Sequence, residues 1–182
     1  FPTRRSSDLF GLSGLRCGVF HTFNSDLYFS MERLSRFIPS SNITQKLIAA
    51  LLSDSAFLTQ YIETYQKRLK HSSGLITKHL DALGFNYYKS DAGLFVLVDF
   101  KSYFCLLKKP LPSHQDEDDA FYHFLMREVK MNWAPGTLSK CRRSGWFRMC
   151  HANSDELLEE VAKRLAQLKQ KLQDYNNAQQ QA

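Results

Sequence analysis

Residues 145–153 read GWFRMCHAN, a glycine followed by strand-forming residues with one arginine among them. Trp146 and Phe147, directly after the turn residue, predict a β-strand. Arg148 would lie among aromatic and sulfur-containing side chains, where a charge is costly to bury unless it is paired. The sequence therefore indicates two roles for Arg148: a salt bridge with an acidic side chain, or the binding of an anionic ligand.

The segments on either side of this strand predict a small α/β unit. FNYYK (85–89) and GLFVLVDF (93–100) are short, rich in β-formers and bounded by turn residues, so both read as strands. VKMNWA (129–134) reads as a further strand. A final helix is expected after Asn153, which forms the pattern of a capping box with Glu156 three residues on.

Helical patterns precede this unit. Apolar residues three and four apart predict one helix that is capped by Asp26 and another that includes Leu47. Ser53-Asp54 fits the N-cap of a third stretch, whose helical period continues to Gly84, a natural residue just past a helix end. A helical run of this length is expected to connect two domains rigidly.

The composition excludes several function classes. Of the 182 residues 43% are hydrophobic, which is ample for a packed core and argues against disorder. The longest wholly apolar stretch, residues 47–52, is far too short to span a bilayer, so no membrane partner is expected. The net charge of +6 is scattered along the chain, so no nucleic-acid partner is expected either.

The four cysteines show neither CxxC spacing nor histidine partners at zinc-finger intervals. We therefore expect no metal site, and we interpret the cysteines as reduced thiols of an intracellular, cytoplasmic protein. Of the four, Cys150 is expected to be buried.

The segment FGLSGLRCG, residues 10–18, places Arg16 in a glycine-rich turn. Glycines let the backbone turn tightly and approach a ligand, and an arginine presents a planar fork that suits a phosphate. By itself this pattern fits a surface arginine after a turn equally well, so both interpretations stay open.

Several stretches together resemble the class I/II aminotransferase family, fold-type I enzymes that use pyridoxal 5′-phosphate (PLP). The resemblance is closest to 1-aminocyclopropane-1-carboxylate (ACC) synthases and synthase-like proteins. The stretches occur in the family's order and span nearly all of residues 10–170: FGLSGLRCG at 10–18, LLSDSAFLTQYI at 51–62, KSDAGLFVLVDF at 89–100, NWAPGTLSKC at 132–141 and GWFRMCHAN at 145–153.

This resemblance implies an α/β fold, the C-terminal part of a fold-type I PLP enzyme. Residues 10–55 would be the end of the large, PLP-binding domain, residues 56–175 the small C-terminal domain, and residues 176–182 a disordered tail. The part at 10–55 is expected to expose apolar surface.

The resemblance also implies roles for single residues. Arg16 would bind the PLP phosphate, and Arg148 would hold the substrate α-carboxylate in a bidentate pair. Residues 91–93, Asp-Ala-Gly, match a structural turn in which Gly93 allows close approach. The loop at 107–119 departs from the family in length and acidity, and is expected to be surface without a chemical role.

The family binds its cofactor as a Schiff base through a lysine eight residues before the phosphate arginine. That position is Asp8, and no lysine occurs before Lys46. Residues 1–9 resemble the in-frame translation of a sequencing adapter, so we interpret them as a non-native segment joined to a truncated enzyme. The alternative is a natural pseudoenzyme with a divergent N-terminus. On either interpretation the chain itself is expected to be inactive.

Two reactions fit the parent protein. The first is that of an ACC-synthase-like lyase, which acts on S-adenosylmethionine if it is a true synthase. The second is transfer of an amino group from an amino acid to a 2-oxo acid. The resemblance also implies a homodimer with its active site at the subunit interface. A third interpretation, a non-catalytic binding module, describes the chain without its lysine.

Overall fold

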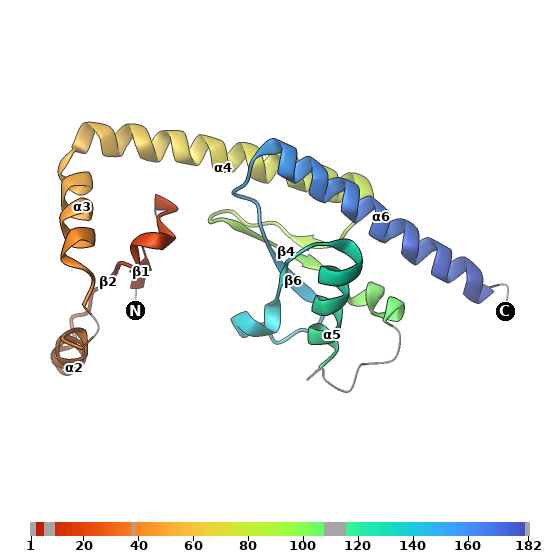
Figure 1. Ribbon diagram of the computed structural model, residues 1–182, viewed down its shortest axis with the longest axis horizontal. Coiled ribbons are helices and arrows are strands. Elements are labelled where there is room, and N and C mark those ends of the chain that lie inside the picture. Colours follow the sequence, from red (N-terminus) through yellow and green to blue (C-terminus); the bar gives the residue numbers. More distant parts are fainter. Residues whose placement is uncertain (1–2, 6–9, 38, 108–115, 181–182) are drawn as a thin grey trace. The chain divides into compact units, whose positions relative to one another are not determined.

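The computed structural model describes residues 3–5, 10–37, 39–107 and 116–180 (Figure 1). The chain divides into two compact units, Phe1–Lys67 and Arg68–Ala182, and the division falls inside one continuous helix, α4 (Ser55–Leu83). The expected long helix is thus confirmed. The expected domain boundary between residues 55 and 56 concerns the whole protein and stays a prediction.

The second unit is built around a four-stranded antiparallel sheet in the order β3-β4-β6-β5. The strands are β3 (Tyr87–Tyr88), β4 (Phe95–Asp99), β5 (Ala134–Pro135) and β6 (Trp146–Cys150). The central pair places Leu97 opposite Arg148 and Val98 opposite Phe147. Three of the four strands lie where the sequence predicts them.

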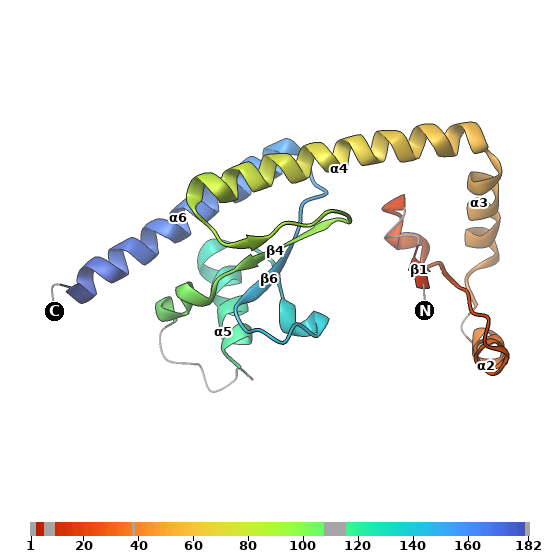
Figure 2. The same cartoon turned by 180° about the vertical axis from the view of Figure 1, so that it is seen from behind.

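One face of this sheet is covered by helices, and the core lies between the sheet and these helices (Figures 1 and 2). Residues alternate along the two central strands, β4 and β6, so every second side chain of these strands enters the core. Besides α4, the covering helices are α5 (Glu117–Phe124) and α6 (Asp155–Gln180). The fully buried core side chains come from all three helices, from the π-helical turn after α5, from both central strands and from the residue that follows β4: Ile76, Leu80, Val98, Phe100, Phe121, Leu125, Phe147, Leu158, Leu165 and Leu168.

Helix α6 runs beside the second half of α4, as both ribbon views show. His71 Nε2 lies 2.9 Å from Asp155 Oδ2, and Lys169 donates from Nζ to the carbonyl oxygen of Leu83 at the end of α4. Gly84 follows with a φ of +68°, the left-handed conformation expected of the residue past a helix end.

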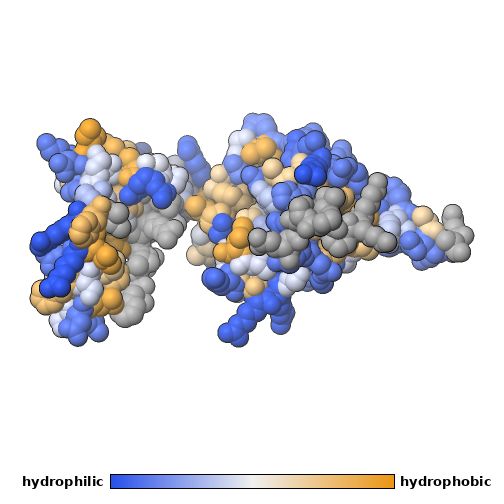
Figure 3. All heavy atoms as spheres, turned by 60° about the horizontal axis from the view of Figure 1, so that its bottom comes forward, coloured by the Kyte–Doolittle hydropathy of each residue, from blue (hydrophilic) through white to orange (hydrophobic). Residues whose placement is uncertain are grey.

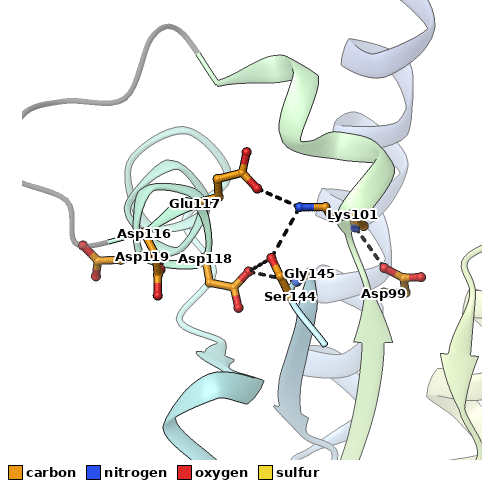
Figure 4. A network of polar contacts seen from close by, with 8 residues as sticks. All are labelled: Asp99, Lys101, Asp116, Glu117, Asp118, Asp119, Ser144 and Gly145. Carbon is orange, nitrogen blue, oxygen red and sulfur yellow. Dashed lines mark hydrogen bonds and ion pairs between the residues drawn. The ribbon is translucent and has the colours of Figure 1, made fainter. Parts of the chain in front are cut away.

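A buried carboxylate joins α5 to the start of β6 (Figure 4). Asp118 is 2% exposed, and its Oδ1 accepts hydrogen bonds from Ser144 Oγ at 2.6 Å and from the Gly145 backbone N–H at 2.8 Å. Its Oδ2 is buried and has no hydrogen-bond partner among the described residues. Lys101 lies beside Asp118 and Ser144, with its Nζ 2.7 Å from Glu117 Oε2 and 3.4 Å from Ser144 Oγ.

This carboxylate corrects the expectation for the loop at 107–119. Residues 116–119 begin a helix, and one of its acidic side chains points into the protein. The reason is that the backbone N–H of Gly145 needs an acceptor in the interior, and Asp118 in the first turn of α5 supplies it. Residues 108–115 of the loop lie outside the described residues.

Two further expectations in this unit are wrong in detail. The predicted strand at 129–134 is mostly not a strand, because the α5 segment continues as a π-helical turn, Leu125–Val129, and only Ala134 of the stretch enters β5. The cap of α6 is Ser154, whose Oγ accepts from Leu157 N at 3.4 Å. Asn153 instead donates from Nδ2 to the Cys150 carbonyl.

The end of the chain also differs from the expected disordered tail at 176–182. Helix α6 continues through Gln180, and residues 181–182 lie outside the described residues. The segment has no glycine or proline to end a helix, and Gln170 Nε2 donates to Asp174 Oδ1 one turn on.

In the described residues of the first unit, two short strands pair with each other and α-helices follow them. These are β1 (Thr3–Arg5), which pairs with β2 (Gly18–Phe20), then α2 (Ser25–Ser35), α3 (Asn42–Ser53) and the start of α4. Helix α2 is capped by Asn24, not by the expected Asp26, because Asn24 Oδ1 accepts from Leu27 N at 3.0 Å. Asp54 caps α4 as expected, since its Oδ1 accepts from Phe57 N at 2.9 Å.

Neither α2 nor α3 has a buried residue. Figure 3 shows apolar residues on the surface of this unit. The exposed apolar side chains include Tyr28, Phe29, Leu34, Phe37, Ile43, Leu47 and Leu52. The expectation that this part of the chain exposes apolar surface is therefore confirmed. Within the described ranges, no helix is both long and apolar enough to cross a membrane.

Candidate functional site

The glycine-rich turn of the first unit holds Arg16 in an unusual backbone conformation. The turn starts at Gly11 with φ of +66° and continues as a short 3₁₀ helix, Ser13–Leu15. Arg16 follows with φ of +49°, in the left-handed region. A residue other than glycine adopts this region at a cost, and such strain concentrates at functional sites.

Two tyrosines of α4 hold this turn in place. The Tyr61 hydroxyl donates to the carbonyl oxygen of Phe10, and the Tyr61 ring lies 6.1 Å from the Phe10 ring. Tyr65 stacks on Tyr61 at 6.0 Å, and a Cβ added at Gly11 would lie 3.9 Å from the Tyr65 ring. Phe10 and Gly11 are thus packed against one face of α4.

The Arg16 side chain is exposed, and only its backbone N–H has a partner among the described residues, the Ser13 carbonyl at 3.3 Å. Its guanidinium therefore keeps its N–H groups for a ligand. A planar fork of donors on a strained, glycine-rich turn suits a phosphate group.

Arg148 lies on the sheet face opposite the core, in the middle of β6. Its side chain is half-buried. Nη1 donates to Ser139 Oγ at 3.3 Å, and the guanidinium carbon Cζ lies 4.5 Å from the ring centroid of Phe95 on β4.

The surroundings of Arg148 bear on its two expected roles, a salt bridge or the binding of an anion. Within the described part of the chain, no carboxylate forms an ion pair with it. Asp99, on the same face of β4, accepts instead from the Lys101 backbone N–H at 2.9 Å and from Asn86 Nδ2 at 3.2 Å. One of the five guanidinium N–H groups is satisfied by Ser139, so a fork remains for an anion.

Arg16 belongs to the first unit and Arg148 to the second. The predicted position of the missing lysine, Asp8, lies outside the described residues. Sequence reasoning missed the two neighbours of Arg148, Phe95 and Ser139. The register of β4 against β6 is the signal that would have found Phe95.

Two expectations near Arg148 need correction. Gly93 has φ of +90°, but a Cβ there would meet nothing within 4 Å, so the glycine serves the backbone conformation and not a close approach. Cys150 is exposed, because it shares a strand face with Arg148 and not with the buried Phe147 and Met149. All four cysteines are free thiols.

Comparison with known proteins identifies the family. The family model "Aminotransferase class I and II" matches residues 7–165. This chain belongs to that family.

Among curated class I and II relatives, the chain is 34% identical over 172 residues to 1-aminocyclopropane-1-carboxylate synthase 4 of Solanum lycopersicum, covering 94% of this chain and 34% of that protein. It is also 34% identical over 152 residues to 1-aminocyclopropane-1-carboxylate synthase-like protein 1 of Arabidopsis thaliana, covering 84% and 30%. The chain thus spans about a third of the length of these relatives.

Solved structures show the same fold at lower identity. The aromatic aminotransferase of Pyrococcus horikoshii matches with a TM-score of 0.73 at 19% identity, over 96% of this chain and 43% of that one. A mutant of Thermus thermophilus aspartate aminotransferase gives 0.69 at 23%, over 88% and 40%. The expected fold class, part of a fold-type I aminotransferase, is confirmed.

Pyridoxal 5′-phosphate is the cofactor of this family, and the residues described here fit one part of it. Arg16, exposed and without an acidic partner in the described ranges, suits the cofactor's phosphate. The covalent attachment finds no counterpart, because Asp8 stands at the expected lysine position and cannot form an imine.

Proposed function

We propose that this chain is the part of an ACC-synthase-like, PLP-dependent enzyme that supplies two anion-binding arginines. Arg16 would bind the cofactor phosphate and Arg148 the α-carboxylate of an amino-acid substrate. The observation that carries the proposal is the state of Arg148: a half-buried guanidinium with no acidic partner among the described residues. Such a group is stabilised when an anion binds it.

When bound, the cofactor supplies a ring that stabilises negative charge on the substrate α-carbon. The residues of this chain determine how the reactants are held. Arg148 would donate two parallel N–H···O hydrogen bonds to the carboxylate, which fixes the orientation of the adjacent α-carbon. Lysine at this position would offer a point charge and no such fork.

For the substrate, we propose S-adenosylmethionine, with closure of a cyclopropane ring in the intact enzyme. The support is that the curated relatives are named ACC synthases at identities of 34–37% in the first three matches. The alternative is amino-group transfer to a 2-oxo acid. The solved structures reported above are aminotransferases, but at identities below 25% they show only the fold and do not decide between the two reactions.

We further propose that the chain as given is inactive and that its parent is active. Asp8 at the lysine position supports the first statement. We propose a homodimer for the intact protein, which the exposed apolar surface of the first unit is compatible with. The four free thiols are compatible with a reducing compartment such as the cytoplasm.

The test starts from the transcript upstream of the codon for Phe10. A Ser-x-Ser-Lys directly before this segment would support the active parent, whereas a continuous reading frame without lysine would contradict it and favour a pseudoenzyme. The complete protein should then develop a visible absorption band on addition of PLP, and should convert S-adenosylmethionine to a cyclopropane amino acid. Release of a 2-oxo acid instead would establish the alternative.

A further inference from the structure

Phe95 is an aromatic side chain on the face of the sheet opposite the core, so it does not contribute to core packing. It is 38% exposed at the start of β4, and its neighbours Val96 and Val98 on the other face are the ones that enter the core. Phe95 pairs with Cys150 in the strand register, which places it diagonally across from Arg148.

The ring of Phe95 restricts the guanidinium of Arg148 on one side. The 4.5 Å between Cζ and the ring centroid is within the range in which an aromatic face attracts a cation. Ser139 restricts the group a second time, through the hydrogen bond that its Oγ accepts from Nη1. Ser139 and Phe95 come from different elements, the 3₁₀ turn Gly136–Ser139 and β4, so the arginine is held from two directions.

A long arginine side chain loses rotamer freedom when it binds a ligand, and that loss weakens binding. A ring that already holds the guanidinium removes part of this cost in advance. The other N–H groups of Arg148 have no acidic partner within the described residues. The contacts with Phe95 and Ser139 therefore leave guanidinium donors available for a carboxylate.

We propose that Phe95 is a positioning residue, which holds the Arg148 guanidinium in the orientation that receives the substrate carboxylate. This rests on the carboxylate role of Arg148 proposed above. The two proposals can be tested separately. The first predicts that Arg148 binds a carboxylate, and the second predicts that removal of the Phe95 ring weakens that binding.

The experiment uses the 182-residue chain, labelled with ¹⁵N. The Nε–Hε resonance of Arg148 is assigned by its loss in Arg148→Lys. It is then followed in the native chain and in Phe95→Leu, Phe95→Tyr and Tyr88→Leu, during titration with sodium acetate against sodium chloride at equal ionic strength. Tyr88, on edge strand β3, is the matched control, an exposed aromatic whose loss keeps the Phe95–Arg148 pair.

Before acetate is added, the Hε resonance should be displaced upfield by the ring in the native chain and in Phe95→Tyr, but not in Phe95→Leu. Acetate should shift the resonance more than chloride does. The acetate affinity should fall about threefold to tenfold in Phe95→Leu, and should be retained in Phe95→Tyr and in the Tyr88→Leu control.

Native acetate affinity in Phe95→Leu would overturn the positioning role and leave the carboxylate site intact. No difference between acetate and chloride in the native chain would overturn both proposals. A native Hε resonance at the same position as in Phe95→Leu would overturn the stacking itself.

Discussion

Replacing Asp118 by alanine tests whether the buried carboxylate holds the second unit together. In the native chain its Oδ1 accepts from the Gly145 N–H at 2.8 Å and from Ser144 Oγ at 2.6 Å. Gly145 is buried, and its own carbonyl accepts from Phe100 N at 2.7 Å, so both backbone polar groups of this residue are hydrogen-bonded. Alanine leaves the N–H without a partner.

The size of the effect follows from these contacts. Loss of a carboxylate acceptor by a buried N–H costs about 1.5–3 kcal/mol. The exposed Ser144 hydroxyl can turn to water, so it adds less than about 1 kcal/mol. Alanine also removes Oδ2, a buried polar atom with no partner among the described residues, and this offsets about 1 kcal/mol of the destabilisation. We therefore expect Asp118→Ala to lower the free energy of unfolding by about 0.5–3 kcal/mol, centred near about 2 kcal/mol, a sizeable part of the stability of a domain this size.

The assay is urea unfolding of the 182-residue chain, followed by tryptophan fluorescence. Both tryptophans, Trp133 and Trp146, lie in the second unit and report its unfolding. Glu117→Ala is the matched control, because its exposed ion pair with Lys101 is worth at most about 1 kcal/mol. If Asp118→Ala lost no more stability than this control, the carboxylate would not hold β6, and our reasoning would be refuted.

Three other substitutions give distinct outcomes. Gly145→Ala should lower the melting temperature of the second unit sharply, because φ is +92° and the new Cβ would lie 2.7 Å from Lys101 Cβ; an unchanged value would show that the turn can adapt. Burial lowers the pKa of His151 below its ordinary 6.5, so the unfolded state takes up the proton first, and the free energy of unfolding should fall as pH drops below 6.5. In urea unfolding between pH 7.5 and pH 5, His151→Asn should make the free energy of unfolding depend less on pH than it does in the native chain. An identical pH dependence in both chains would show that the buried imidazole is not its source. In the complete protein, Arg148→Lys should raise the Kd for the amino-acid substrate far more than the Kd for PLP, and an equal loss of both would contradict its carboxylate role; Arg142→Lys, in the exposed turn before β6, is the control.

The parts of the fold that follow from local pattern could be predicted. The 3.6-residue period yields α4, and the cap at Asp54 and the left-handed Gly84 mark its ends. Strand composition yields β4 and β6. These features depend on neighbours within a few residues in the sequence, which is why a single sequence contains them.

The features that could not be predicted depend on partners distant in the sequence. Asp118 stands in a run of acidic residues typical of a solvated loop, and its burial depends on Gly145, twenty-seven residues away. The contact of Phe95 with Arg148 needs the strand register. The exposure of Cys150, in contrast, could have been predicted from the alternation along β6, because a strand that exposes Arg148 also exposes the residue two positions on.

Strand β6 serves two purposes with alternate residues: Phe147 and Met149 fill the core while Arg148 faces outward. An insertion or deletion of one residue in this strand would exchange these sets and lose the core and the arginine together. Asp118 fixes the chain at Ser144 and Gly145, and Ser139 is bound to Arg148. In natural variants of this protein, changes of length in this region should therefore be confined to residues 140–143.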